Sequence, residues 1–237
     1  MKAIRTYIPN TVTCLNLLSG CTAVFFAVNL DIAPAGLQAL AWAFIFIGAA
    51  AVFDFCDGLS ARLLHAYSPM GKELDSLSDL VSFGLAPAFL VMNVMLDHGS
   101  PMWAAAFSMF IALMGALRLA KFNVDTRQTT SFVGLPIPAN AIFWIGVLAW
   151  IQSHTYPGDI AMIIIILAIS LLMVSELKMF SLKFANLSFR DNVRRYVILA
   201  AAILFVSTEG LSGLAWTIIL YILISVLGKK TDTAAGE

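Results

Sequence analysis

Long apolar stretches, separated by short polar segments, run along most of the chain. A helix that crosses a bilayer needs roughly 20 mostly apolar residues, and several stretches reach or approach that length. The polar and glycine residues Thr208, Glu209 and Gly210 favour a tight hairpin between the last two stretches over one long helix. The pattern predicts about eight transmembrane helices, at Thr11–Leu30, Leu37–Asp57, Leu77–Leu96, Met102–Lys121, Ile137–Gln152, Ile160–Ser175, Tyr196–Ser207 and Leu211–Gly228.

Composition supports a membrane protein. Hydrophobic residues make up 60% of the 237 residues and charged residues only 12%, far from the balance of a soluble domain. We therefore expect an all-α, polytopic membrane helical bundle in one domain, residues 1–228, followed by a short cytoplasmic tail, residues 229–237. Membrane lipids are the expected surroundings, and nucleic acid is not an expected partner.

The basic residues predict the orientation, because loops on the cytoplasmic side collect Lys and Arg. With an even number of spans and the N-terminus inside, the connections on the other side carry acids and histidines, around Asp31, Asp97, His154 and Glu209. Both termini are then cytoplasmic, in a cell inner (cytoplasmic) membrane. The inner segments hold all 14 basic residues: Lys2, Arg5, Arg62, Lys72, Arg118, Lys121, Arg127, Lys178, Lys183, Arg190, Arg194, Arg195, Lys229 and Lys230.

Four aspartates stand out at the second and third spans. Asp54 and Asp57 end the second span, and Asp75 and Asp79 open the third, so each pair shares a helical face. Like charges repel and acids near hydrocarbon are costly, so a divalent cation is the economical compensation. Oxygen ligands favour Mg²⁺ or Mn²⁺, and four carboxylates from two helices could bridge two ions, which suits phosphoryl chemistry.

Small residues interleave with these acids. Gly58 and Ala61 would let a phosphorylated ligand approach the backbone, and Gly71 does likewise. Pro69 and Gly71 are expected to break the helix between the two acid pairs. Arg62 could contact a phosphate oxygen or pair with an acid. Any one aspartate could instead be a simple helix-end acid, but that explanation does not account for all four together.

The arrangement Asp54-x2-Asp57-Gly58-x2-Ala61-Arg62-x8-Gly71-x3-Asp75-x3-Asp79 resembles, at every fixed position, the signature of the CDP-alcohol phosphotransferases. That family transfers a phosphatidyl-type group from a CDP-linked lipid to an alcohol and releases CMP. The resemblance implies that Asp54, Asp57 and Asp75 hold metal, and that Asp79 contacts metal and serves as the base. It also implies a homodimer and a CDP site, lined by Gly58, Ala61, Arg62 and Gly71.

Segments outside the signature narrow the resemblance. They are similar to bacterial type II phosphatidylserine synthases, which implies L-serine as the acceptor, CDP-diacylglycerol as the donor and phosphatidylserine as the product, made on the cytoplasmic face. The segments are Pro9-Asn10-x2-Thr13-x2-Asn16-x3-Gly20, residues 78–87, residues 118–123 and residues 132–141.

Candidates for the remaining contacts are polar residues at the cytoplasmic ends of the first and fourth spans. Arg118 and Lys121 could bind the carboxylate of serine or a lipid phosphate, or simply end their helix. Asn10, Thr13 and Asn16 share a face; we assign the first two to the CDP-lipid and Asn16 to the acceptor, with polar contacts between helices as the alternative.

Two other functions remain open from the sequence. The first is the same chemistry with glycerol 3-phosphate or inositol phosphate as acceptor. Such doubly negative acceptors call for a dedicated basic cluster, and only Arg118 and Lys121 are obvious. The second is an ion transporter that uses intramembrane acids. The acids lie at the cytoplasmic ends of the spans, and the outer halves of the spans lack matching polar residues. This argues against an ion path across the membrane.

Overall fold

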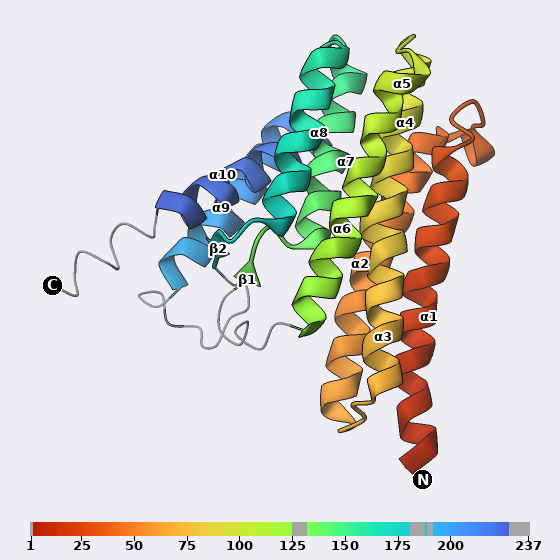
Figure 1. Ribbon diagram of the computed structural model, residues 1–237, viewed down its shortest axis with the longest axis vertical. Helices are drawn as coiled ribbons and strands as arrows, with labels where there is room; N and C mark the ends of the chain where they lie inside the picture. The colour runs from red at the N-terminus through yellow and green to blue at the C-terminus, as the bar shows by residue number, and fades with distance from the viewer. Residues whose placement is uncertain (1, 125–131, 181–187, 189–191, 228–237) are drawn as a thin grey trace, which may run out of the picture.

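The computed structural model describes residues 2–124, 132–180, 188 and 192–227, and within them it is dominated by helices (Figure 1). The predicted tail, residues 229–237, lies outside the described residues, as do Arg127, Lys183 and Arg190. The main helices are α1 (Lys2–Ala27), α2 (Ala39–Leu63), α3 (Pro69–Asp79), α4 (Ala86–Asp97), α5 (Met102–Ala105), α6 (Met109–Val124), α7 (Ile137–Ser153), α8 (Asp159–Val174), α9 (Val193–Glu209) and α10 (Gly213–Leu227).

Some of these helices join into longer rods. The π-helical segment η2 (Leu80–Leu85) connects α3 to α4, and the 3-10 segment η3 (Ala106–Ser108) connects α5 to α6. Five stretches of the described chain are long and apolar enough to cross a membrane. They are Tyr7–Ala27, Ala39–Leu63, Pro69–Asp97, Met102–Val124 and Val193–Leu227, and the apolar helices α7 and α8 are shorter. The protein is therefore a helical membrane protein.

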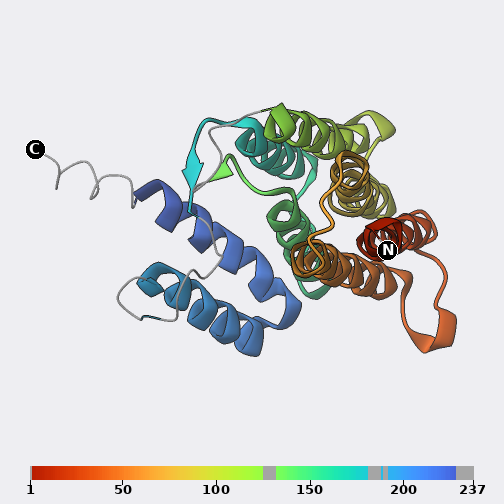
Figure 2. The ribbon, with the colours of Figure 1, turned by 90° about the horizontal axis from the view of Figure 1, so that it is seen from below.

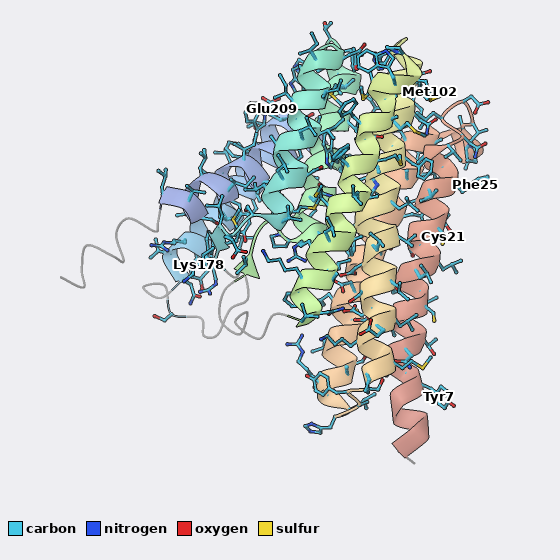
Figure 3. The ribbon with its side chains drawn as sticks, in the orientation of Figure 1. Tyr7, Cys21, Phe25, Met102, Lys178 and Glu209 are labelled. Carbon is cyan, nitrogen blue, oxygen red and sulfur yellow. The ribbon has the colours of Figure 1, made fainter. Side chains whose placement is uncertain are left out.

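The outer surface of the bundle agrees with this assignment. Figure 3 shows Tyr7, Cys21 and Phe25 pointing away from the other helices along α1. The side chains of Tyr7 and Phe25 are 68% and 54% exposed, and that of Ile160 on α8 is 77% exposed. Apolar side chains at such exposure fit contact with lipid rather than water.

The predicted hairpin near the C-terminal end of the chain is confirmed. Val193–Leu227 is not one straight helix, because Gly210 adopts a positive φ of 62° and α9 and α10 lie on either side of it. Figures 1 and 2 show this helix pair to one side of the other helices. α10 packs closely on α7, where Gly146 meets the backbone of Ala215.

The core lies between α1, α2, η2, α4 and α7, and it contains the fully buried side chains of Phe83, Leu90 and Trp144. One small departure from an all-helical chain is a two-stranded antiparallel sheet, in which β1 (Phe132–Val133) pairs with β2 (Lys178–Met179). Glycine is needed directly after β1, since Gly134 has a φ of +76° and a Cβ there would lie 2.2 Å from the Met173 carbonyl oxygen.

Candidate active site

The acids predicted at the second and third spans converge on one point. Ligand oxygens of Asp54 and Asp57 on α2 and of Asp75 on α3 all lie within 4.8 Å of one another. Asp54 and Asp57 share a face of α2 because they are three residues apart. The structure thus brings three of the four predicted metal ligands into one cluster, near the end of the bundle where α2 gives way to α3 (Figure 1).

The turn that creates this convergence lies between Leu63, where α2 ends, and Pro69, where α3 begins. Ser68 is the N-cap of α3, and its hydroxyl accepts a hydrogen bond from the Gly71 amide at 3.0 Å. Pro69 at the first helical position suits a helix start, since proline lacks the amide hydrogen that has no partner there. The expectation that Gly71 would break the helix is wrong: Gly71 lies inside α3, where the Ser68 cap satisfies its amide.

The donor set suits a hard divalent cation. Asp57 is only 6% exposed, and its Oδ2 atom has no hydrogen-bond partner among the described residues. A buried carboxylate oxygen without a donor is costly, and a bound cation would satisfy it. Three clustered carboxylates are also the oxygen ligands that Mg²⁺ and Mn²⁺ prefer. The residues therefore fit a metal site.

A cavity of about 220 Å³ opens beside the cluster, between α1, α2 and the start of α3. Arg62 lies outside the lining: it is exposed and donates from Nε to the Gly58 carbonyl at 2.9 Å. The lining contains the other residues predicted for the CDP-lipid, namely Asn10, Thr13, Gly58, Ala61 and Gly71, together with Asp57 and Asp75. It also contains Pro9, Ala66, Tyr67, Ser68 and Lys72, which were not predicted to bind the CDP-lipid.

Asp79, the last residue of α3, lies outside the three-acid cluster. It is 9% exposed and is not among the three acids whose oxygens lie within 4.8 Å, although it interacts electrostatically with Asp54 and Asp75. The Asn16 side-chain amide donates to Asp79 Oδ1 at 3.3 Å. The fourth predicted acid is thus buried near the cluster but separate from it, with its own hydrogen bond from Asn16.

The two basic residues predicted for the acceptor differ in their surroundings. Arg118 on α6 is only 7% exposed, and its Nε has no hydrogen-bond partner among the described residues. Its guanidinium lies 5.7 Å from the centre of the Phe122 ring and interacts electrostatically with Asp79. Lys121, by contrast, forms an ion pair with Glu176 beyond the end of α8. Arg118 therefore faces the site with donor capacity to spare, whereas Lys121 links two segments of the chain.

A larger cavity lies elsewhere. It measures about 650 Å³ and lies between the α1–α2 connection and the neighbouring ends of α4 and α7, at the opposite end of the bundle. Its lining residues Asp31, Asp97 and His98 are exposed. Because none of them belongs to an acid cluster of the kind formed by Asp54, Asp57 and Asp75, we place the chemistry at the smaller cavity.

Comparison with known proteins agrees with this geometry. Residues 6–181 match the CDP-alcohol phosphatidyltransferase family. The chain belongs to that family. All of the cluster, the cavity and Arg118 lie within the matched part, and α9 and α10 lie beyond it.

Relatives of this CDP-alcohol phosphatidyltransferase include three named CDP-diacylglycerol–serine O-phosphatidyltransferase. The protein from Bacillus subtilis is 38% identical over 172 residues, which cover 73% of this chain and 89% of the relative. That from Methanocaldococcus jannaschii is 36% identical over 171 residues, covering 72% of each chain. That from Helicobacter pylori strain J99 is 28% identical over 224 residues, covering 92% of this chain and 89% of the relative.

Several residues that support the site in this phosphatidyltransferase were missed from sequence. Lys72 donates to the Asn123 carbonyl at 3.0 Å, and Asn123 donates to the Ser76 hydroxyl at 2.9 Å, so α3 is fastened to the end of α6. Asn140 on α7 donates to the Phe83 carbonyl at 3.0 Å. Polar residues within apolar spans are a signal of such contacts, but the sequence does not identify their partners.

Proposed function

We propose that this protein transfers the phosphatidyl group of CDP-diacylglycerol to the hydroxyl of L-serine and releases phosphatidylserine and CMP. The cluster of Asp54, Asp57 and Asp75 carries the proposal, because two of its members line the cavity and it provides a metal site beside a space for a nucleotide diphosphate. Membership of the family supports the transfer chemistry. The names of the relatives support serine as the acceptor.

Asp54, Asp57 and Asp75, with Asp79 nearby, would hold Mg²⁺ or Mn²⁺, and we infer two ions from the number of carboxylates. Bound there, the ions would supply Lewis-acid stabilisation of charge on the phosphate oxygens. The protein's own part is to fix the acids. The Ser68 cap sets the start of α3, which packs on α1 and places Asp75 beside the acids of α2, and the Thr13 hydroxyl approaches the Asp57 carboxylate.

In the proposed reaction, the serine hydroxyl oxygen forms a bond to the phosphorus that carries diacylglycerol. The bond from that phosphorus to the bridging oxygen breaks, and CMP leaves with the electron pair. Asp79 accepts the hydroxyl proton. An aspartate is a weak base for an alcohol, so most of the rate enhancement must come from alignment and charge stabilisation. The enclosed position of Asp79 suits a proton acceptor shielded from bulk water.

The donor is expected to lie with its nucleotide in the cavity and its acyl chains in the bilayer. Gly58, Ala61 and Gly71 present small side chains to the cavity, and Asn10 and Thr13 offer polar atoms. Arg62 could turn toward a phosphate from the rim. A stripe of exposed apolar side chains continues along α2 on the lipid side, formed by Val52, Phe55, Leu59 and Leu63. These side chains suit contact with the acyl chains of a lipid donor.

Arg118 is the residue we assign to the serine carboxylate. Its guanidinium is buried, carries a free donor and lies close enough to Asp79 for electrostatic interaction. A guanidinium matches a carboxylate with two parallel hydrogen bonds. Lys121 remains a candidate for the outer part of the acceptor site, where it would have to share its charge with Glu176. One buried cation fits a single carboxylate better than the double charge of glycerol 3-phosphate.

The wider setting is also a proposal. We infer about eight spans, with both termini and the acid cluster on the cytoplasmic side of the inner membrane, from the distribution of Lys and Arg. The separation of the 35-residue stretch Val193–Leu227 into α9 and α10 supports the even number. A homodimer is inferred from the family alone.

The test is CMP release by the purified full-length protein with CDP-diacylglycerol and Mg²⁺ or Mn²⁺. L-serine, glycerol 3-phosphate and inositol phosphate are offered separately. We expect release that depends on metal and on serine, with phosphatidylserine as the lipid product. Release of CMP with glycerol 3-phosphate but not with serine would overturn the assignment of serine as the acceptor. No release with any alcohol, together with metal-ion flux in liposomes, would instead favour a transporter.

A further inference from the structure

Asn16, in the middle of α1, is completely buried, and both ends of its side-chain amide are engaged. Its Nδ2 donates to Asp79 Oδ1 at 3.3 Å, and its Oδ1 accepts a hydrogen bond from the Ser82 hydroxyl at 2.7 Å. The hydroxyl of Ser82 also lies 3.1 Å from the Asn16 carbonyl oxygen. An ionised carboxylate can only accept hydrogen bonds, so the NH₂ group of Asn16 faces Asp79 and the amide oxygen is left to accept from the Ser82 hydroxyl.

The backbone is shaped to allow these contacts. A Cβ on Gly20 would lie 2.3 Å from the Ser82 Oγ and 2.8 Å from its Cα, so only glycine lets α1 approach η2 this closely. Ser82 belongs to the π-helical segment η2, which begins directly after Asp79. On the other side, Asn140 donates to the carbonyl of Phe83 within the same segment. π-helical turns are uncommon and occur often at functional sites, where they need such compensating contacts.

We propose that Asn16 and Ser82 are positioning residues that hold the Asp79 carboxylate in its working orientation, and that Asn16 does not itself contact the acceptor alcohol. This proposal rests on the proposed function, in which Asp79 takes the proton of the acceptor. The hydrogen bond from Asn16 occupies Oδ1 and limits rotation of the carboxylate, so that one defined oxygen remains for the reaction. Complete burial of Asn16 behind Asp79 leaves it no surface to offer to serine. The sequence-based assignment of Asn16 to the acceptor is thereby replaced.

The first experiment separates turnover from binding. In Asn16→Ala and in the volume-matched Asn16→Leu, kcat for CMP release should fall by about 10- to 100-fold, the range for losing one hydrogen bond to a charged group. The KM values for serine and CDP-diacylglycerol should stay within about twofold. A higher KM for serine with kcat preserved would mean that Asn16 contacts the acceptor, and would overturn the proposal. So would an unchanged kcat in both variants accompanied only by a lower melting temperature.

The second experiment tests whether Ser82 acts through Asn16. Ser82→Ala should lower kcat by about 3- to 10-fold, and adding it to Asn16→Ala should lower kcat no further. Ser19→Ala is the matched control, because Ser19 is also buried in this region but donates only within α1, to the Leu15 carbonyl at 2.8 Å. Its kcat should stay within about twofold of the wild type. Two results would overturn the proposal that Ser82 acts through Asn16: losses of kcat that multiply in the double variant, or an equal loss of kcat in Ser19→Ala.

Failure of the positioning role can be distinguished from failure of the proposed function. If the wild-type protein releases CMP with another alcohol, the proposed acceptor fails, and the same variants measured with that alcohol still test the positioning of Asp79. If the wild type releases no CMP with any alcohol, the proposed function and the positioning role of Asn16 and Ser82 fail together. If the wild type is active with serine and Asn16→Ala has the wild-type kcat, only the positioning role of Asn16 and Ser82 fails.

Discussion

Replacing Asp57 with asparagine should have opposite effects on stability with and without metal. Two unit charges interact by about 332/(ε·r) kcal/mol, and the Asp54, Asp57 and Asp75 oxygens lie within 4.8 Å of one another. At an effective dielectric constant of about 20, each fully charged pair then costs about 3.5 kcal/mol or more. Three pairs cost about 10 kcal/mol in the absence of a cation. Asp57→Asn removes two of those pairs.

Water and proton uptake reduce this repulsion, because Asp54 and Asp75 are only partly buried. Even a fraction of the two removed pairs amounts to about 1–2 kcal/mol, and each kcal/mol shifts the melting temperature of a chain of this size by about 2–4 °C. We therefore expect Asp57→Asn to melt a few degrees higher than the wild type in excess chelator. In saturating Mn²⁺ or Mg²⁺ the order should reverse, because the wild type gains stability from the bound ion and the variant gains little.

The assay is thermal unfolding of the purified protein in detergent, with and without metal. Asp31→Asn is the control, since Asp31 lines the cavity at the opposite end of the bundle and should change neither curve. Two results would refute the reasoning: a wild-type melting temperature that does not rise with metal, or a variant Asp57→Asn that melts below the wild type in chelator. Either would mean that the carboxylates do not form a metal site whose mutual repulsion is relieved by the ion.

Four further outcomes follow from the structure. Asp79→Asn should lower kcat by about 10²- to 10⁴-fold while CDP-diacylglycerol binding stays close to wild type, and unchanged turnover would exclude Asp79 as the base. Arg118→Gln should raise the KM for serine at least about tenfold with a smaller change for CDP-diacylglycerol, and the reverse pattern would place Arg118 at the lipid phosphate. Gly146→Ala should lower the melting temperature by several degrees, because its Cβ would lie 2.2 Å from the Ala215 amide nitrogen, whereas Gly48→Ala meets nothing within 4 Å and should be neutral or stabilising. Tyr156→Phe removes the hydrogen bond from the phenol to Asp159 and should cost about 1 kcal/mol of stability without changing kcat. Burial raises the pKa of Tyr156, so this contribution should be complete below about pH 10 and disappear as the pH rises further.

Hydrophobic periodicity predicted most of the helices, because lipid requires the backbone to satisfy its own hydrogen bonds within each span. It placed the ends less well. α2 continues to Leu63 and α3 starts at Pro69, so Asp54, Asp57 and Asp75 lie inside α2 and α3, and Asp79 is the last residue of α3, where η2 continues the rod. The polar residues of the turn predicted a loop over a longer segment than the structure uses. The Ser68 cap explains the difference, since it lets a helix begin directly after the reversal.

The acid cluster was predictable because its members are close in sequence and share helical faces. Its supporting contacts were not, because they depend on how distant helices dock. Asn16 and Asp79 are 63 residues apart, and Lys121 meets Glu176 across 55 residues. The π-helical segment after Asp79 has no clear sequence signal either. Its contacts come from distant helices, with Gly20 of α1 facing Ser82 and Asn140 of α7 donating to the Phe83 carbonyl.

The burial of the acids separates two tasks within one site. Asp54 and Asp75 are partly exposed, and Asp75 lines the cavity, so in the proposed function this part of the site stays open to the nucleotide. Asp79 is buried, lies apart from that cluster and is held by Asn16, with the Arg118 guanidinium on α6 close enough to interact with it electrostatically. A base must keep one orientation through many exchanges of ligand, and a buried hydrogen-bonded carboxylate does so. The acceptor is therefore expected to bind on the α6 side of Asp79, between the base and Arg118, while the donor occupies the α1–α2 side.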